Sequence, residues 1–333
     1  MEESMLPIQP KLAATTAAEY LGITIQAIHK KLKSEDIVLP KIGNKAYITH
    51  EIGQKLFNID FSPKKIAFQI VKGGTGKTTS LHNVACAASL YGAKVLLVDI
   101  DPQGNLTDSF NVSAEQAPVV VDILSGDATA ADAVINAFPG IDIIPSRIEN
   151  VVLDTKLNAE RVGLHYFFGN MLKEIEDQYD FILIDCPPMI SSAVTAATLY
   201  SDLVLVPLNP DKFSAKGLEI LRGEIKNIKK HYQIPTNYKV FLNKYSSNTI
   251  LSDKAIQTII AEETAQGNAL ETAIRLAQEI PNITDGSKNL FSSLKKSTAR
   301  EDFDLLTKEL LEIDLSKTSN KGNATAKPEA ITA

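Results

Sequence analysis

The chain has 333 residues and 44% hydrophobic residues, which is enough for one large α/β domain and a second, small one. Its net charge is −6, which excludes a protein that binds nucleic acid through overall basicity, so a DNA-binding surface must be local. Cys86 and Cys186 are too few for a disulfide framework or a cysteine metal site. We expect them to be small core residues in a reducing cytoplasm, with a redox role as the open alternative. No apolar run approaches the ~20 residues of a membrane span, and the N-terminus lacks a signal-peptide pattern.

Residues 1–60 have a pattern of their own, which predicts a small N-terminal domain. A first short helix ends at Gly22, and the turn after it leads into a second helix. A hairpin around Gly43-Asn44 and a closing helix follow. The elements of this helix-turn-helix layout with a wing are predicted at residues 15–22, 24–32, 38–48 and 50–57.

The second of these helices has a polar, basic side. Its residues Gln26, His29, Lys30 and Lys33 are candidates for DNA contact, because such a helix can enter the major groove while lysines neutralise phosphates. The layout is similar to MerR-type and winged DNA-binding modules. A small dimerisation or packing domain with solvated lysines stays open.

A glycine-rich turn follows the apolar stretch at residues 66–71 and opens a helical pattern at Thr78. A strand, a turn of this kind and a helix form a cradle for phosphate, because backbone N–H groups and the helix N-terminus point at the anion. Val71 takes the place of the usual first glycine, so the loop is a variant, and it carries an extra lysine, Lys72. The predicted ATP-binding residues are Lys72, Gly73, Gly74, Thr75, Gly76, Lys77, Thr78 and Thr79, with the Thr78 hydroxyl placed for Mg²⁺.

Acidic residues close two later apolar strands. Asp99 and Asp101 follow the stretch at residues 94–98, and Asp185 follows residues 181–184. These strands are apolar at successive positions, which predicts a mostly parallel sheet covered by helices on both faces. Polar residues at the carboxyl ends of such strands meet at the ligand crevice. The predicted fold is therefore α/β, a P-loop NTPase at residues 61–314, preceded by the helix-turn-helix-like domain.

The segments KGGTGKTT, VLLVDIDPQGNLT and FILIDCPP resemble the ParA family of DNA-partition ATPases, a branch of the deviant Walker A group. The resemblance runs from about residue 64 to about residue 313. It implies that Lys77 binds phosphate, that Lys72 crosses a dimer interface to the partner's ATP, and that Asp101 orients the attacking water. These three are the predicted catalytic residues.

The resemblance also implies metal and base contacts. Thr78 and Asp185 would hold Mg²⁺, the latter directly or through one water. Asp99 would support the same metal site, with a purely structural role at the strand end as the alternative. Pro207 and Asn243 end neighbouring strands where the family holds adenine, and the alternative is that they only cap strands.

Bulk DNA binding is the other family property, and it needs basic residues on one face. Four such residues lie at helical spacing in residues 218–231, and Lys226 falls where the resemblance suggests a DNA contact. A second cluster precedes the last helix. A merely solvated face is the alternative for both. The two clusters are Arg222, Lys226, Lys229 and Lys230, and Lys295, Lys296 and Arg300.

The C-terminal part distinguishes the chain from relatives that lie on membranes. MinD-like proteins end in a basic amphipathic helix, whereas residues 301–313 here are rich in acids and contain one lysine. Residues 315–333 are small and polar and are predicted to be disordered.

In the middle of the chain, a long helix is predicted at residues 158–178.

The predicted function is that of a plasmid or chromosome partition ATPase in the cytoplasm, associated with the nucleoid. The resemblance implies ATP and Mg²⁺ as cofactors, a homodimer in the ATP state, non-specific DNA binding, and a ParB-like centromere-binding partner that stimulates hydrolysis. The N-terminal domain would bind an operator. A ParA-like ATPase that positions a protein cargo, with this domain as an adaptor, is the alternative. A metal-cluster carrier would need a paired-cysteine motif, which Cys86 and Cys186 do not form.

Overall fold

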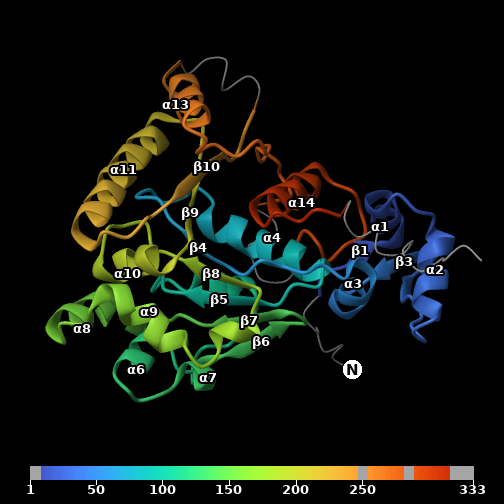
Figure 1. Cartoon of the computed structure of the whole chain (residues 1–333), viewed down its shortest axis with the longest axis horizontal. Helices are drawn as coiled ribbons and strands as arrows, with labels where there is room; N and C mark the ends of the chain where they lie inside the picture. Colours follow the sequence, from blue (N-terminus) through green and yellow to red (C-terminus); the bar gives the residue numbers. More distant parts are fainter. Residues whose placement is uncertain (1–8, 247–253, 281–288, 316–333) are drawn as a thin grey trace, which may run out of the picture.

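A seven-stranded sheet forms the centre of the computed structural model, which describes residues 9–246, 254–280 and 289–315 (Figure 1). Neighbouring strands run parallel, except that the edge strand β6 is antiparallel to β7. The carboxyl ends of the parallel strands therefore share one edge of the sheet, where α/β folds bind ligands. In spatial order the strands are β10 (Tyr238–Leu242), β9 (Leu203–Leu208), β4 (Lys64–Phe68), β8 (Phe181–Asp185), β5 (Val95–Asp99), β7 (Ile141–Ile144) and β6 (Ile135–Phe138).

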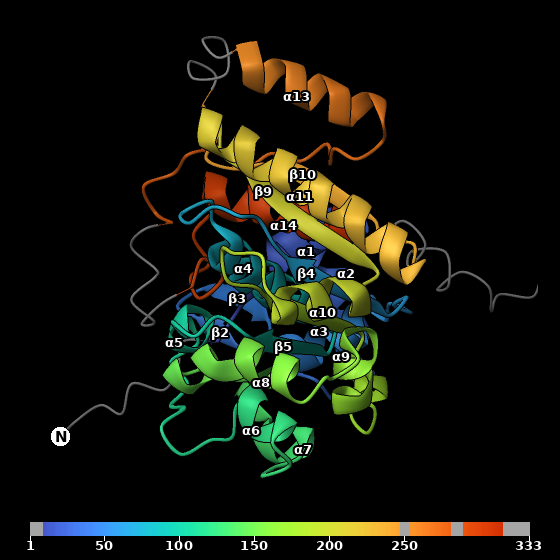
Figure 2. The ribbon, with the colours of Figure 1, turned by 90° about the vertical axis from the view of Figure 1, so that its left-hand side faces the viewer.

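Helices cover both faces of the sheet, as the continuous apolar strands predict. Ile66 and Phe68 belong to the core under α4 and α14, whereas Ala67 between them belongs to the core under α9 and α10. The first face is covered by α4 (Lys77–Leu90) and α14 (Thr298–Leu310), and the second by α8 (Leu153–Ala159), α9 (Leu164–Leu172), α10 (Ser192–Tyr200) and α11 (Lys212–Tyr232). The connections contain α5 (Asn105–Ser109), α6 (Val120–Leu124), α7 (Ala130–Ala133), η1 (Ile148–Val152), η2 (Glu176–Gln178) and α13 (Lys254–Ala265), which lies beside α11 (Figure 2).

The N-terminal module, residues 9–60, has its helices where the sequence predicts them. Gly22 ends the first helix in the left-handed conformation (φ 63°), and the Thr24 hydroxyl accepts a hydrogen bond from the Ala27 N–H at 3.2 Å at the start of the second. A small antiparallel sheet joins them. The elements are β1 (Leu12–Ala13), α1 (Ala14–Leu21), α2 (Ile25–Lys33), β2 (Lys41–Ile42), β3 (Lys45–Ile48) and α3 (His50–Phe57).

The module is not tethered loosely, because its core is continuous with that of the large domain. The rings of Phe57 and Tyr91 lie 5.3 Å apart, and a Cβ on Gly53 would lie only 2.3 Å from the carbonyl oxygen of Leu90. Helix α3 therefore sits against the C-terminal end of α4, and Figure 1 shows α4 pointing at the module. The boundary that the sequence predicted near residue 60 is crossed by shared packing.

Two further features differ from the predictions or go beyond them. The helix predicted over residues 158–178 is broken, because α8 ends at Ala159 and Arg161 adopts a left-handed conformation (φ 52°) before α9 begins. Strand β6 was not predicted. The predicted disordered tail lies outside the described residues except for Leu315. Among the described helices, none combines the length and the apolarity that a membrane span requires.

Candidate nucleotide site

The glycine-rich loop between β4 and α4 adopts a conformation that requires glycine. Gly74 and Gly76 have φ angles of 73° and 91°, which residues with a side chain rarely adopt. A Cβ on Gly76 would also lie 2.2 Å from the Nδ2 atom of Asn243. The loop thus brings its backbone to the N-terminus of α4, whose first residue is Lys77, and forms the phosphate cradle that the sequence predicts.

A cavity of about 540 Å³ opens in front of this loop. Its walls come from the loop, from α4, from the segment after β5 and from the segments after β10. Most of the predicted phosphate-binding residues line it, but Lys72 and Thr75 do not. The lining includes Gly73, Gly74, Gly76, Lys77, Thr78, Thr79, His82, Asn83, Asp101, Gln103, Asn243, Lys244, Leu276, Ala277, Ile280 and Phe303.

Thr78 lines the cavity and contacts Asp185, the other residue that the sequence predicts to hold Mg²⁺. The Thr78 hydroxyl donates a hydrogen bond to Asp185 Oδ2 at 2.6 Å, while Asp185 Oδ1 is buried without a partner among the described residues. Burial raises the pKa of Asp185 to about 7, against the lowering effect of Thr78 and Lys77. A hydroxyl and an under-satisfied carboxylate are hard oxygen ligands, so this pair fits Mg²⁺.

Lys77 lines the same cavity and is buried, with 7% of its surface exposed. Burial lowers the pKa of its ammonium, while the charges of Asp185 and Asp101 act in the opposite direction. A cation in such a dry position attracts phosphate strongly, because little water screens it. The position of Lys77 therefore suits the phosphate-binding role that the loop pattern predicts for it.

Both carboxylate oxygens of Asp99 are already engaged by the protein. Its Oδ2 accepts hydrogen bonds from the N–H and the hydroxyl of Thr107 at 3.0 and 2.8 Å, and its Oδ1 accepts from the Asp101 N–H at 3.1 Å. It is fully buried, and burial together with the nearby Asp185 raises its pKa. The structure favours the structural alternative: Asp99 holds the segment that carries Asp101.

Asp101 itself lines the cavity, as expected for a residue that orients water. Its Oδ1 accepts a hydrogen bond from the Gln103 N–H at 3.0 Å, and the residue is 9% exposed. The turn from Asp101 to Gly104 is closed by a backbone hydrogen bond of 2.9 Å. The carboxylate is therefore held at the rim by the local backbone, with Asp99 beneath it.

Lys72 points away from the cavity and forms an ion pair that the sequence did not predict. Its ammonium donates to both carboxylate oxygens of Asp211, at 2.7 and 2.6 Å, and to the Ser214 hydroxyl at 3.2 Å. Asp211 is the residue before α11 and accepts a hydrogen bond from the Ser214 N–H. Hydrogen bonds from Lys72, together with its charge, lower the pKa of Asp211 despite its partial burial.

Asn243 and Pro207 have different positions, although both were predicted to hold adenine. Asn243 lines the cavity, and its Nδ2 donates a hydrogen bond to the Thr75 carbonyl at 2.7 Å. Pro207 is buried within β9, is paired with Phe241 of β10, and does not line the cavity. The predicted strand end at Pro207 therefore needs correction, because the strand continues to Leu208, and an adenine contact of Pro207 stays a prediction.

Comparison with known proteins agrees with this geometry. A family model described as an AAA domain matches residues 63–240. A ParA family protein of Chlamydia muridarum is 32% identical over 256 residues, which cover 74% of this chain and 97% of that protein. The chain belongs to the ParA family. The sporulation initiation inhibitor protein Soj of Bacillus subtilis is 31% identical over 199 residues, covering 59% of this chain and 78% of Soj.

Solved structures show the same fold at lower sequence identity. A plasmid partition protein of Borrelia burgdorferi B31 bound to AMPPNP has a TM-score of 0.62 at 21% identity, covering 76% of this chain and all of that one (100%). A complex of a Cyanothece McdA variant with ATP has a TM-score of 0.66 at 21% identity, covering 77% and 98%. The P-loop NTPase core predicted from the sequence is thus confirmed.

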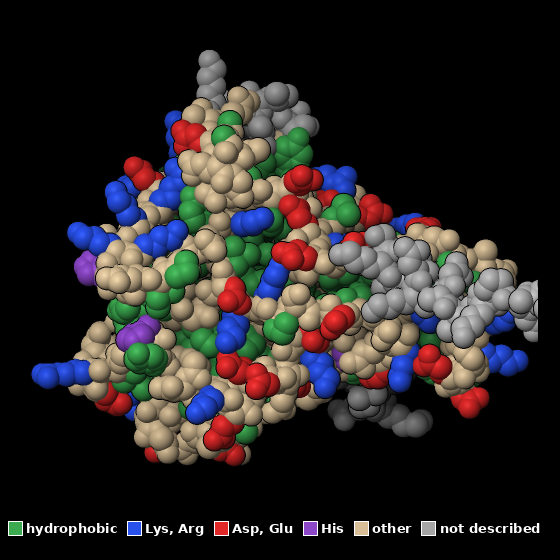
Figure 3. All heavy atoms as spheres, viewed as in Figure 1, with side chains coloured by type: hydrophobic (Ala, Val, Ile, Leu, Met, Phe, Trp, Pro, Cys, Tyr) green, Lys and Arg blue, Asp and Glu red, His purple; other side chains and the backbone are tan. Residues whose placement is uncertain are grey.

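The basic face of α11 is smaller in this ParA family member than its sequence suggests. Lys226, Lys229 and Lys230 are exposed, and Figure 3 shows blue side chains gathered where Figure 1 places α11. Arg222 is instead bound by the buried Glu263, to which its Nε donates at 2.7 Å. Arg222 is therefore not free to contact DNA.

The second predicted basic cluster is also reduced by tertiary contacts. Arg300 is buried, stacks 4.9 Å from the Phe291 ring centre, and donates to the backbone carbonyls of Ser293 and Lys11. Lys296 lies 3.4 Å from Glu19 of the N-terminal module. Arg300 therefore joins the C-terminal region to the module and is not a surface cation.

The exposed side of α2 carries the residues predicted to contact DNA. Gln26, His29, Lys30 and Lys33 are all exposed, while Ile28 and Leu32 on the opposite side are buried. The hairpin tip at residues 41–45, with a lysine at each end, is exposed as well. Both the helix side and the hairpin tip are thus open to a ligand among the described residues, and the exposed Val38 and Ile42 add apolar side chains to the hairpin.

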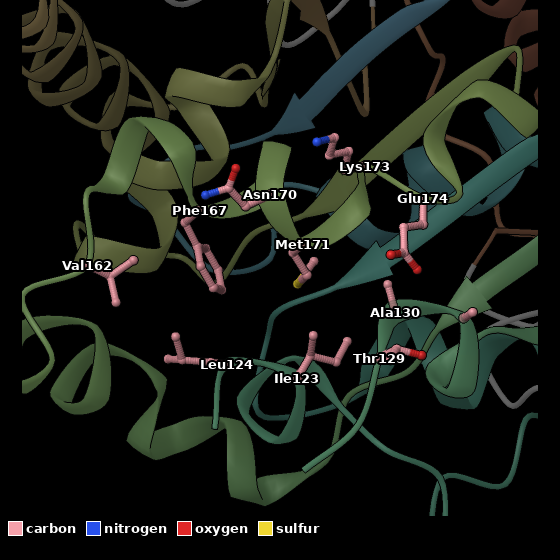
Figure 4. Close-up of a pocket in the computed structure, with 11 residues that line it drawn as sticks. Ile123, Leu124, Thr129, Ala130, Val162, Phe167, Asn170, Met171, Lys173 and Glu174 are labelled. Atoms are coloured by element: carbon pink, nitrogen blue, oxygen red, sulfur yellow. The ribbon is translucent and has the colours of Figure 1, made fainter. Parts of the chain in front are cut away.

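A second hollow, of about 390 Å³, lies far from the P-loop between α6, α7 and α9 (Figure 4). Its floor is apolar, with Ile123, Leu124, Phe167 and Met171, and Lys173 and Glu174 lie at its rim. The rim charges are of opposite sign and give no preference for a charged ligand. Within the described residues, no cluster of three or more His, Cys, Asp or Glu side chains is arranged to hold a metal ion.

Sequence reasoning missed several residues that shape the nucleotide site. Asp211 follows a proline and precedes a helix, so the sequence indicates a helix cap at this position and not a partner for Lys72. Thr107 stands in the motif that carried the family resemblance, but its hydroxyl bridges Asp99 and the Ser146 N–H, a contact that only the fold reveals. Lys244 follows Asn243 directly and reaches the P-loop.

Proposed function

We propose that this chain is an ATP-hydrolysing partition protein that dimerises around two nucleotides and binds DNA in two ways. The observation that supports this most is the division of labour between two lysines of one loop. Lys77 lies in the cavity, while Lys72 is held outside it by Asp211. A lysine that is held outside the site of its own subunit is suited to serve a second one.

The chemistry that we propose is hydrolysis of Mg·ATP. Mg²⁺, when held by Thr78 and Asp185, would neutralise charge on the phosphate oxygens. Lys77 and the backbone N–H groups of the loop bind the same phosphates, and Asp101 orients a water for attack. Asp99 keeps Asp101 in place through the backbone. Positioning and charge neutralisation are the main requirements of phosphoryl transfer, and these residues together with Mg²⁺ would supply both.

The face around the P-loop has the character of an interface. It exposes large apolar side chains, of which Phe213 is 73% exposed and Met189 50%. Phe213 also lies near Lys72, with the ammonium 5.8 Å from the ring centre. Exposed apolar patches of this kind are typical of surfaces that bind a partner. We assign this face to a second copy of the chain, bound when both sites hold ATP. Four further apolar side chains in segments that follow the neighbouring strands β7 and β8 are exposed as well, namely Ile148, Val151, Val152 and Ile190.

Two separate surfaces serve DNA in this proposal. The lysines of α11 bind any duplex through its phosphates, and α2 with the hairpin binds a specific operator through base edges. The two surfaces lie on different parts of the molecule, α11 beside β9 and α2 beyond the end of α4 (Figures 1 and 2). A ParB-like protein on the centromere would stimulate hydrolysis and release the nucleoid.

Charge reversals in the full chain test the two DNA surfaces. Deletion of the N-terminal module is unsuitable, because it would expose the core that Phe57 shares with Tyr91. We expect Lys226→Glu to weaken ATP-dependent binding to random DNA and to spare operator binding, and Lys30→Glu to do the reverse. Lys94→Glu, the same charge change at an exposed site just before β5 and outside both α2 and α11, is the control.

Fluorescence anisotropy on operator-region and random DNA across a salt series measures both activities. The proposal fails if Lys226→Glu and Lys30→Glu have equal effects on both DNAs. It also fails if random-DNA binding is independent of ATP. If Lys30→Glu leaves all DNA binding unchanged, the module is an adaptor for a protein cargo instead.

A further inference from the structure

Lys244 stands out because its backbone conformation is unfavourable for its residue type. It follows Asn243 at the end of β10 and has a φ angle of 54°, in the left-handed region that favours glycine. Such a conformation costs free energy and persists where the surroundings require it. The requirement here lies in the P-loop. The Lys244 ammonium donates to the Gly74 carbonyl at 2.8 Å, and the neighbouring Asn243 Nδ2 donates to the Thr75 carbonyl at 2.7 Å.

Two adjacent side chains thus bind two adjacent carbonyls of the phosphate loop. The side-chain oxygen Oδ1 of Asn243 accepts a hydrogen bond from the Lys244 N–H at 2.9 Å, which fixes the orientation of the side-chain amide. Its NH₂ group keeps one hydrogen beyond the bond to Thr75. With the ammonium anchored at Gly74, the four-carbon stem of Lys244 must span from β10 to the loop. Lys244 lines the cavity, so this stem forms part of the wall.

The rest of the wall in this part of the cavity is apolar. It is formed by Leu276, Ala277 and Ile280 from the segment after β10 and by Phe303 of α14. Ligand sites commonly pair apolar walls with a few polar groups that fix orientation. A purine base has two flat apolar faces and polar edges. The stem of Lys244, the amide of Asn243 and this apolar wall match those features.

We propose that Lys244 is a positioning residue for the base of the bound nucleotide. Its ammonium ties the end of β10 to the phosphate loop, and its methylene stem covers one face of the purine. The proposal rests on nucleotide binding at the P-loop. It assigns the charge of Lys244 to the protein carbonyl and leaves the phosphates to Lys77, so its effect must depend on the base.

Two ligands separate these roles, namely Mg·ATP and inorganic tripolyphosphate with Mg²⁺, which has the phosphates without the base. We expect Lys244→Gly, which relaxes the backbone and removes the side chain, to weaken Mg·ATP binding about tenfold. Tripolyphosphate binding is expected to stay within about twofold of wild type. Lys244→Met keeps the stem without the tether, and we expect it to lose only about two- to threefold for Mg·ATP.

Gln233→Gly is the matched control. Gln233 also has a left-handed backbone, with a φ of 58°, but it ends α11 outside the cavity. The change relaxes the backbone in the same way, so we expect it to alter neither affinity. Isothermal titration calorimetry measures the affinities, and a thermal melt of each variant shows that the fold is kept. If Lys244→Gly does not fold, comparison of Lys244→Met with the wild type still separates the contribution of the charge from that of the stem.

Three results overturn the proposal. Equal weakening of both ligands by Lys244→Gly makes Lys244 a phosphate cation. Unchanged Mg·ATP binding gives it no role in the site. If Lys244→Met binds Mg·ATP as weakly as Lys244→Gly does, the effect comes from the charge and not from the stem. Absence of Mg·ATP binding by the wild-type chain is a different failure, since it removes the nucleotide function itself.

Discussion

Releasing Lys72 from Asp211 is expected to strengthen the ATP-dependent dimer. In Asp211→Asn the side-chain oxygen that accepts from Ser214 at the start of α11 is kept, while the negative charge that holds Lys72 is lost. The wild-type lysine must leave this ion pair before it can reach the partner's nucleotide. Without the pair that cost disappears, so the dimer forms more readily.

The size of the effect follows from the exposure of the pair. The Lys72 and Asp211 side chains are 22% and 35% exposed, so the pair lies near the surface and contributes about 0.5–1 kcal/mol. A symmetric dimer breaks two such pairs, which gives about 1–2 kcal/mol and a dimer about five- to thirtyfold tighter.

Sedimentation velocity with a slowly hydrolysed ATP analogue measures the dimer dissociation constant over a concentration series. Glu176→Gln is the matched control. Glu176 and Lys65 form an ion pair of comparable exposure, with 2.8 Å between the ammonium nitrogen and the carboxylate oxygen, and this pair lies outside the P-loop. We expect the control to dimerise like the wild type. A dimer of unchanged or lower affinity in Asp211→Asn refutes the idea that this ion pair opposes dimerisation.

Three further predictions concern chemistry, packing and pH. Asp101→Ala is expected to bind Mg·ATP and dimerise normally but to lose hydrolysis, since only water orientation is removed; near-normal phosphate release in a steady-state assay contradicts the assignment. Gly53→Ala is expected to lower the free energy of unfolding by about 1–3 kcal/mol in urea titrations, because its Cβ would lie 2.3 Å from Leu90 O. The control Gly223→Ala has open space around the added methyl group, and equal stability of the two variants would show that the module packs loosely. Burial lowers the pKa of His82 from 6.5 to about 4, so the unfolded state takes up the proton first as the pH falls. The wild type is therefore expected to lose up to about 3 kcal/mol of its free energy of unfolding between pH 6.5 and 4. Urea midpoints of wild type and His82→Leu at several pH values measure this loss, which only the wild type should show. Equal pH slopes of the two proteins contradict the prediction.

Much of the fold was predictable because it depends on local pattern. Residues 66–68, 95–98 and 181–184 of three strands are apolar at successive positions, which predicts burial on both faces. The turn with Gly74 and Gly76 needs φ angles that favour glycine, so its sequence alone indicated the phosphate loop. The helices of the N-terminal module were predictable for a similar reason, since Gly22 and Thr24 mark their ends.

Helix boundaries in the large domain were less predictable. The sequence pattern continued across Arg161, but that residue takes a left-handed conformation and separates α8 from α9. Helix propensity is a weak preference that tertiary packing overrides. The position of Pro207 was also not predictable from the sequence. Whether a strand residue reaches a ligand depends on where its own strand and the neighbouring strands end.

The sequence by itself determined which chemical groups the nucleotide site contains, because the P-loop, Thr78 and the strand-end aspartates are defined by their neighbours in the chain. Only the tertiary structure decided which charges remain free. Arg222 is bound by Glu263, which follows it by 41 residues, and Lys72 is bound by Asp211, 139 residues away. A charge is neutralised by whatever lies within a few ångströms, and folding, not sequence separation, brings such partners together. Local sequence therefore predicts the residues of this site, whereas their availability depends on contacts between distant parts of the chain.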